Sequence, residues 1–129
     1  MKIALGTVQF GINYGVNSTT GQVQPDEVGK ILTYARTQNI TLLDTANSYG
    51  SSEKVLGNVG IKSFSIVTKT RHFKQTVIND QSVELLLADL NQSLQLLKQK
   101  TVYSLLVHNA DDLLKPGSNK IICRLQALK

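Results

Sequence analysis

The chain has 129 residues, of which 41% are hydrophobic and 18% charged, and its formal net charge is +5. This composition is typical of a globular chain, which excludes a disordered or fibrous one, and the length predicts one domain or part of a larger one. No apolar run approaches the roughly 20 residues of a membrane helix, and a single cysteine excludes an internal disulfide. We therefore expect a cytoplasmic protein without a membrane partner.

The positive charge alone would favour a polyanionic partner, but lysine and arginine are scattered along the chain. Only the segment 69–74 is locally basic, and aromatic residues do not interleave with it. We therefore expect no nucleic-acid partner, and we expect no metal in the functional site.

The first predicted strand runs from Lys2 to Gly6 and leads into a long loop, Thr7 to Gln24, in which glycine and asparagine recur. Pro25 then opens a helix, because proline suits the first helical turn and the acids after it favour the positive end of the helix dipole. Apolar residues at helical spacing give this helix one buried face, formed by Val28, Ile31, Leu32 and Ala35.

The second predicted strand is Thr41 to Asp44, and the short helix that starts near Ser51 is stopped by Gly57. The third strand is Ser63 to Lys69. We expect Ser82 to cap the longer helix that follows, in which apolar residues keep helical spacing at Val83, Leu86, Leu87, Leu90, Leu94 and Leu97.

The fourth predicted strand is Val102 to His108, and Pro116 and Gly117 separate it from a last helix. Cys123 lies beside the apolar face of that helix, so we expect it to fill a small space in the core. The face itself is formed by Ile121, Ile122, Leu125 and Leu128.

Four strand–helix units with strands apolar on both faces predict a parallel sheet covered by helices. A doubly wound sheet and a (β/α)8 barrel both fit this pattern. Polar residues at the carboxyl ends of three successive strands favour the barrel, whose active sites lie at that rim. The first loop also lacks the G-x-G-x-x-G sequence expected of a dinucleotide-binding doubly wound sheet. We predict a partial (β/α)8 TIM-type barrel of four units, in which residues 1–129 form one incomplete domain.

Four residues at this rim could carry chemistry together. Asp44, Lys69 and His108 end three successive predicted strands, and Tyr49 follows Asp44 on a loop rich in glycine and serine. Reduction of a carbonyl group needs a proton at oxygen, and an ammonium beside a phenol makes the phenol a stronger acid. A carboxylate would hold the ammonium, and an imidazole could orient the carbonyl. Each residue alone also has a structural explanation, whereas their common placement favours one site. His72 is expected on the surface.

The motif after the second strand resembles that of the aldo-keto reductase family. Its residues are Asp44-Thr45-Ala46, Tyr49-Gly50, Ser52-Glu53 and Leu56-Gly57, and shorter matches occur at Leu5-Gly6-Thr7, Thr68-Lys69-Thr70 and Leu106-Val107-His108. This resemblance implies an oxidoreductase that transfers hydride from NADPH to an aldehyde or ketone.

The resemblance also implies a role for each residue. Tyr49 would be the general acid, Lys69 would make it a stronger acid, Asp44 would pair with Lys69, and His108 would orient the carbonyl. Gly6, Thr7 and Asp44 would contact the nicotinamide–ribose end of the cofactor.

The family resembled has an eight-stranded barrel whose later strands complete the cofactor site, and four predicted strands would leave two unpaired edges. We therefore expect the 129-residue chain alone to be inactive and to bind NADPH weakly or not at all. The exposed edges could pair two copies as a homodimer or cause aggregation, and the chain could be a fragment or a disrupted gene product.

Two other functions remain open. The chain could be a non-catalytic half-barrel, as a remnant or an interaction module. It could also belong to another barrel enzyme, such as an isomerase or aldolase in which Lys69 forms a Schiff base. Neither the carbonyl substrate nor the choice between NADH and NADPH follows from the sequence.

Overall fold

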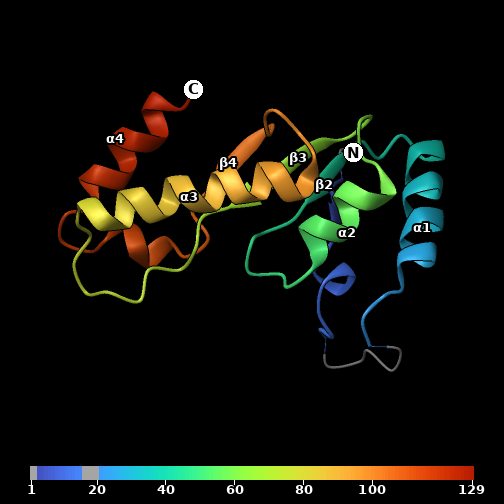
Figure 1. Cartoon of the computed structure of the whole chain (residues 1–129), viewed down its shortest axis with the longest axis horizontal. Coiled ribbons are helices and arrows are strands. Elements are labelled where there is room, and N and C mark those ends of the chain that lie inside the picture. The colour runs from blue at the N-terminus through green and yellow to red at the C-terminus, as the bar shows by residue number, and fades with distance from the viewer. Residues whose placement is uncertain (1–2, 16–20) are drawn as a thin grey trace.

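The computed structural model describes residues 3–15 and 21–129. Within them, four parallel strands pair in the order of the chain, and each is followed by a helix (Figure 1). The strands are β1 (Leu5–Gly6), β2 (Leu42–Asp44), β3 (Ser65–Lys69) and β4 (Ser104–Leu106). The helices are α1 (Pro25–Thr37), α2 (Ser52–Val59), α3 (Asp80–Leu97) and α4 (Asn119–Ala127). The predicted succession of four β-α units is confirmed.

The register of the sheet aligns the ends of its strands. Gly6 pairs with Asp44, Asp44 pairs with Val67, and Lys69 pairs with Leu106. Because the carboxyl ends of parallel strands meet at one edge of a sheet, this register brings the residues that follow β2, β3 and β4 to the same rim.

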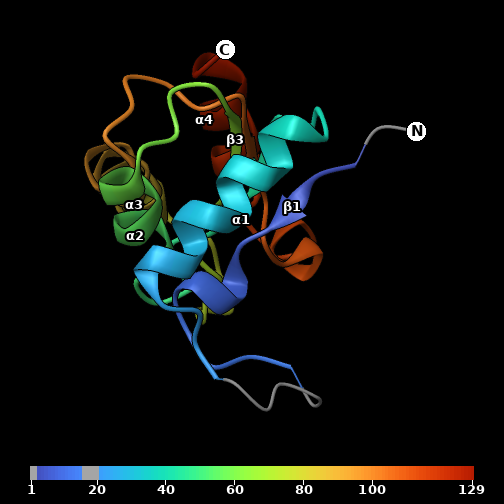
Figure 2. The same cartoon turned by 90° about the vertical axis from the view of Figure 1, so that its right-hand side faces the viewer.

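Apolar residues form two clusters that hold the helices to the sheet. The larger cluster joins α1, α2 and the sheet, and it includes Val28, Leu32, Leu43, Leu56, Ile61 and Ile66. The smaller one joins α3 and α4 through Phe73, Ile78, Leu86 and Ile121. Helices α2 and α3 lie side by side (Figures 1 and 2), so they connect the two parts of the core.

The observed strands are shorter than the predicted ones, and two predictions lie partly outside the described residues. These are Lys2, at the start of the first strand, and residues 16–20 of the first loop. The described part of that loop contains a short 3-10 helix, η1 (Val8–Phe10). His108 was predicted within the fourth strand, but β4 ends at Leu106, so His108 lies on the loop that follows.

Three predictions about the helices are wrong. Gly57 does not end α2, which continues to Val59 and is closed by Gly60 at a φ of 94°. Asn79, not Ser82, is the N-cap of α3: Asn79 Oδ1 accepts from Ser82 N, and Asn79 N donates to Ser82 Oγ. Cys123 is exposed rather than in the core, since α4 buries Ile121 against α3 and turns Cys123 outward.

Gly57 is inside α2 because the helix crosses α3 there at close range. A Cβ at this position would lie 2.0 Å from the Leu96 carbonyl oxygen, a backbone atom that cannot move aside cheaply. We therefore expect Gly57→Ala to destabilise the fold by about 1–3 kcal/mol, as overpacking typically does. The shift of the urea unfolding midpoint measures this effect.

Gly29→Ala is the matched control, because Gly29 also lies within a helix. A Cβ at Gly29 would meet only Val59 Cγ1, at 3.8 Å, so the gain in helix propensity should stabilise α1 by about 0.5–1 kcal/mol. Equal midpoint shifts for the two variants would contradict the close-packing explanation of Gly57.

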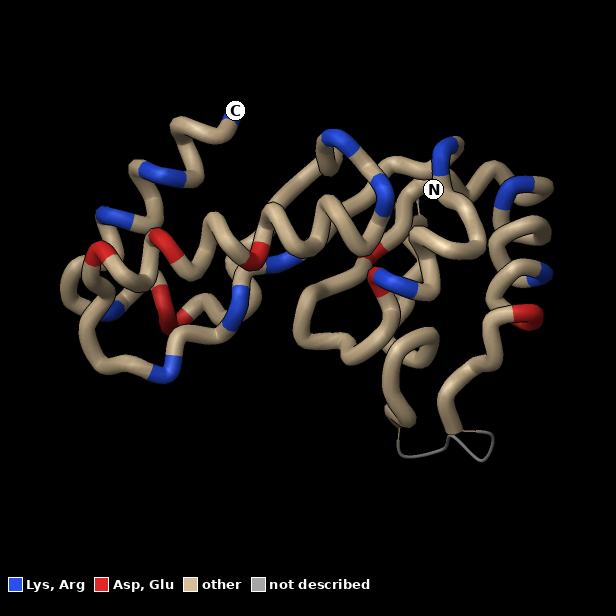
Figure 3. The backbone as a smooth tube through the Cα atoms, in the orientation of Figure 1, with Lys and Arg blue, Asp and Glu red and all other residues tan. Residues whose placement is uncertain are grey.

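Strands β1 and β4 are the two edges of the sheet formed by the described residues. Large apolar side chains near them are exposed, among them Ile3, Tyr103 and Leu106. Lysine and arginine are distributed along the whole backbone rather than on one element (Figure 3). None of the helices in the described residues combines the length and the hydropathy that crossing a bilayer would need.

Candidate active site

Asp44 and Lys69 form the centre of the rim at the carboxyl ends of β2 and β3. The Lys69 ammonium donates to both carboxylate oxygens of Asp44, at 2.8 Å each, and to the Thr45 carbonyl oxygen at 2.9 Å. The Lys69 side chain is only 13% exposed and that of Asp44 is 35% exposed. All three donor hydrogens of the ammonium therefore have acceptors within the protein.

Tyr49 lies against this ion pair. Its ring centroid is 5.0 Å from Lys69 Nζ, which places the ammonium over the ring face, a favourable arrangement for a cation and an aromatic ring. The rings of Tyr49 and His108 meet edge to face, with centroids 5.9 Å apart and planes at 86°. The Tyr49 ring thus contacts both the ammonium and the imidazole.

The loop that carries Tyr49 is seated on the loop after β1. A Cβ at Gly11 would lie 1.7 Å from the Tyr49 carbonyl oxygen, and one at Gly50 would lie 2.6 Å from the Gly11 carbonyl oxygen. Gly50 also has a φ of 58°, a conformation that glycine adopts without strain. The two glycines let the backbones approach closely, and this fixes the position of Tyr49.

His108 is held from two directions. Its backbone N donates to Thr70 Oγ1 at 3.3 Å, which ties the loop after β4 to the loop after β3. Its ring Nδ1 lies 3.3 Å from Ser48 Oγ, on the loop that also carries Tyr49. Both side chains are exposed to solvent at the rim.

A network of buried hydroxyl groups supports the backbone of Asp44. The Asp44 carbonyl oxygen accepts from both the backbone N and the Oγ1 of Thr7, each at 3.0 Å. Ser52 Oγ donates to the Thr7 carbonyl oxygen and lies 3.2 Å from Thr45 Oγ1. Thr7 is fully buried, whereas Gly6 has open space where a Cβ would stand. Of Gly6 and Thr7, both predicted to contact a cofactor, Gly6 is therefore the accessible one.

Glu53 is a buried acid under the same rim. It is 2% exposed, and its Oε1 accepts from Thr68 Oγ1 at 2.7 Å. Burial raises the pKa of Glu53, and the charge of Asp89 raises it further, while hydrogen bonds from Thr68 and Ser93 act in the opposite direction. The folded state therefore favours the protonated form of this carboxyl more than the unfolded chain does.

Glu53 should make the stability depend on pH. Because its pKa is raised on folding, the folded state binds the proton more tightly, and stability falls as pH rises from the unfolded value, about 4.3, through the raised one. Glu53→Gln keeps an acceptor for Thr68 without the charge, so its free energy of unfolding should fall less over this range. Urea unfolding at several pH values measures the difference.

The control is Glu84→Gln, the same substitution at an exposed residue of α3. This variant should follow the pH profile of the unmodified chain. A Glu53→Gln profile parallel to that of the unmodified chain would contradict the account of Glu53.

The structure brings Asp44, Tyr49, Lys69 and His108 together at one rim. His72 is exposed, as predicted, and lies near Asn109, whose Nδ2 is 2.8 Å from His72 Nε2. Sequence reasoning missed the contacts of Ser48 and Thr70 with His108 and gave no role to Glu53. Two of them carry a sequence signal, since Glu53 falls within the motif that contains Tyr49 and Thr70 within the shorter match Thr68-Lys69-Thr70.

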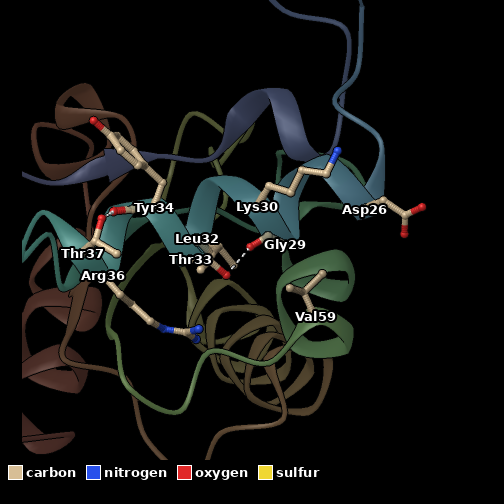
Figure 4. Close-up of a pocket in the computed structure, with 9 residues that line it drawn as sticks. All are labelled: Asp26, Gly29, Lys30, Leu32, Thr33, Tyr34, Arg36, Thr37 and Val59. Carbon is tan, nitrogen blue, oxygen red and sulfur yellow. Dashed lines mark hydrogen bonds between the residues drawn. The ribbon is translucent and has the colours of Figure 1, made fainter.

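An open groove elsewhere on the molecule does not belong to this site. Figure 4 shows that it follows α1, where Thr33 Oγ1 donates to the Gly29 carbonyl oxygen at 2.9 Å. Its lining includes Lys30, Tyr34, Arg36 and Val59 and none of the four rim residues.

A parallel sheet with an Asp–Lys pair, a tyrosine and a histidine at its carboxyl rim defines part of a (β/α)-barrel with a polar rim site. Comparison with known proteins identifies the family, since the model of the aldo/keto reductase family matches residues 2–128. The chain therefore belongs to the aldo-keto reductase family. No curated protein matches it.

Solved structures agree with this membership. Two structures from Pseudomonas aeruginosa, described as aldo-keto reductases, are 32% and 30% identical to the chain, with TM-scores of 0.78 and 0.75. Each match covers 98% of this chain, and 50% and 48% of the respective relative. The aldo-keto reductase AKR11C1 from Bacillus halodurans is 18% identical, with a TM-score of 0.70 over 99% of this chain and 42% of its own, and supports the fold alone. The chain thus spans about half the length of these relatives, and its fold matches the corresponding part of their structures.

Proposed function

We propose that the chain carries the proton-transfer side of an aldo-keto reductase that reduces an aldehyde or ketone with NADPH. The observation that supports this most directly is the Tyr49 ring, which contacts both the Lys69 ammonium and the His108 imidazole. A phenol in this position can donate a proton to a carbonyl oxygen, and the ammonium stabilises the negative charge that develops on it.

The other residues fit this proposal. Asp44 and the Thr45 carbonyl hold Lys69 as a charged donor, rather than as the neutral amine that a Schiff base needs, so the contacts oppose the aldolase alternative. His108 is exposed beside Tyr49, where it can orient a carbonyl oxygen.

A nicotinamide cofactor would supply the hydride when bound. Gly6 and Asp44 fit one end of such a cofactor, because Gly6 faces open space and the neighbouring Asp44 is 35% exposed. Thr7 would act through its support of the Asp44 backbone, since its hydroxyl is buried and donates to Asp44.

A chimeric enzyme tests the proposal. In it, residues 3–128 of this chain replace the matching half of the Pseudomonas aeruginosa relative that is 32% identical. We expect NADPH oxidation that depends on an added aldehyde or ketone, measured against the complete relative. A folded chimera that binds NADPH but reduces none of a broad panel of carbonyl compounds would contradict the proposal.

The 129-residue chain by itself should bind NADPH with a dissociation constant well above the micromolar range, because the described rim offers contacts for only one end of the cofactor. Calorimetric titration measures this, and micromolar affinity would contradict it.

Self-association through the edges of β1 and β4 and a cytoplasmic location are further parts of the proposal. Sedimentation of the 14.1 kDa chain tests the former.

A further inference from the structure

Ser48 is a polar residue of the rim to which the proposed mechanism gives no role. Its hydroxyl oxygen lies 3.3 Å from Nδ1 of His108, a residue 60 positions later in the chain. Ser48 directly precedes Tyr49, so the loop that carries the proposed acid also contacts the proposed orienting imidazole. The two groups that would face a carbonyl oxygen are therefore positioned by one short segment.

The contact matters because a neutral imidazole carries its hydrogen on only one nitrogen. A carbonyl oxygen accepts hydrogen bonds, so only a ring nitrogen that bears hydrogen can hold it. The nitrogen engaged by a fixed neighbour determines the state of the other one. With Nδ1 occupied by Ser48, Nε2 is the nitrogen left for substrate.

We propose that Ser48 is a positioning residue that donates its hydroxyl hydrogen to Nδ1 of His108 and thereby keeps the hydrogen of the neutral ring on Nε2. His108 then offers an Nε2–H donor on a ring that contacts Tyr49. If His108 instead donated from Nδ1 to Ser48, Nε2 would carry a lone pair and would repel the carbonyl oxygen.

The backbone supports this placement of the ring. The bond from His108 N to Thr70 Oγ1 fixes where the side chain leaves the loop after β4, and the edge-to-face contact with Tyr49 restricts rotation of the ring. The close approach of Gly11 and Gly50 fixes the loop that carries Ser48. Contacts of both loops thus hold Ser48 and His108 in place, although both side chains are exposed.

The test is the nitrogen NMR spectrum of the imidazoles in the 129-residue chain at a pH of about 8, where histidine is mostly neutral. The chain has two histidines, so His72 serves as an internal reference. We expect His108 to show a hydrogen-free Nδ1 and a hydrogen-bearing Nε2, displaced from the tautomer mixture of free histidine. In Ser48→Ala the two nitrogen shifts should move to the values of free histidine, and Ser48→Thr should restore them.

The signals of His72 should stay unchanged in both variants, and the backbone amide spectrum shows that each variant is folded. Unaltered His108 shifts in Ser48→Ala, or a hydrogen-bearing Nδ1 in the unmodified chain, would overturn the proposal. Its catalytic consequence rests on the proposed function, but the measurement needs neither cofactor nor substrate. A chimera without reductase activity would therefore contradict the function and leave the assignment of Ser48 to be decided by the spectrum.

Discussion

Replacing Tyr49 with phenylalanine is expected to lower carbonyl reduction by about a hundred-fold or more in the active chimera, because a positioned general acid typically contributes about 10²–10⁴ to the rate. The aromatic ring and its contacts with Lys69 and His108 remain, so the fold and the KM for NADPH should stay nearly unchanged. The loss should therefore appear in kcat, measured from initial rates of NADPH oxidation at saturating cofactor.

Tyr103→Phe is the matched control, since Tyr103 is 73% exposed beside β4 and lies away from the rim ion pair. It removes the same hydroxyl and should leave kcat within about two-fold, as expected for a surface change. An active chimera in which Tyr49→Phe also leaves kcat unchanged would exclude Tyr49 as the proton donor.

Replacing Lys69 with methionine should destabilise the fold by about 1–3 kcal/mol, a loss visible in the urea unfolding of the 129-residue chain. The substitution keeps the unbranched stem of the side chain but leaves the Asp44 carboxylate and the Thr45 carbonyl oxygen without their shared donor. Because the Asp44 side chain is 35% exposed, water compensates in part, which keeps the loss below that of a fully buried pair.

Two further variants separate the ion pair from other effects of the change. Lys30→Met removes a partner of Glu27 from a surface pair, in which the side chains are 75% and 55% exposed, and should cost at most about 0.5 kcal/mol. The double variant Lys69→Met/Asp44→Asn should recover part of the lost stability, since a neutral amide then replaces the carboxylate that has lost its partner. No recovery would show that the loss comes from packing rather than from charge.

Much of the rim could be predicted from the sequence, because the decisive information is local. Asp44 and Lys69 each follow a short apolar strand, and parallel strands bring their carboxyl ends to one edge whatever the details of packing. The three hydrogen bonds of Lys69 are a consequence of that rule. Tyr49 could be placed near them because only a short loop separates it from Asp44.

Contacts between distant loops could not be predicted in this way. Ser48 contacts His108, which lies 60 residues later, and Thr70 accepts from the backbone N of His108 across 38 residues. No periodicity in the sequence predicts which loop residues face each other. Local rules also misplaced helix features when a tertiary contact decided the outcome. By local rules Gly57 predicts the end of helix α2. In the structure it lies within that helix, and its lack of a side chain allows the close contact with α3 at Leu96.

The close approach of Gly11 and Gly50 has a mechanical consequence. A Cβ at Gly11 would strike the Tyr49 carbonyl oxygen and one at Gly50 would strike that of Gly11, so the segment after β1 and the segment bearing Tyr49 pack backbone against backbone. A side chain at either glycine would push the two segments apart and displace the backbone of Tyr49 itself.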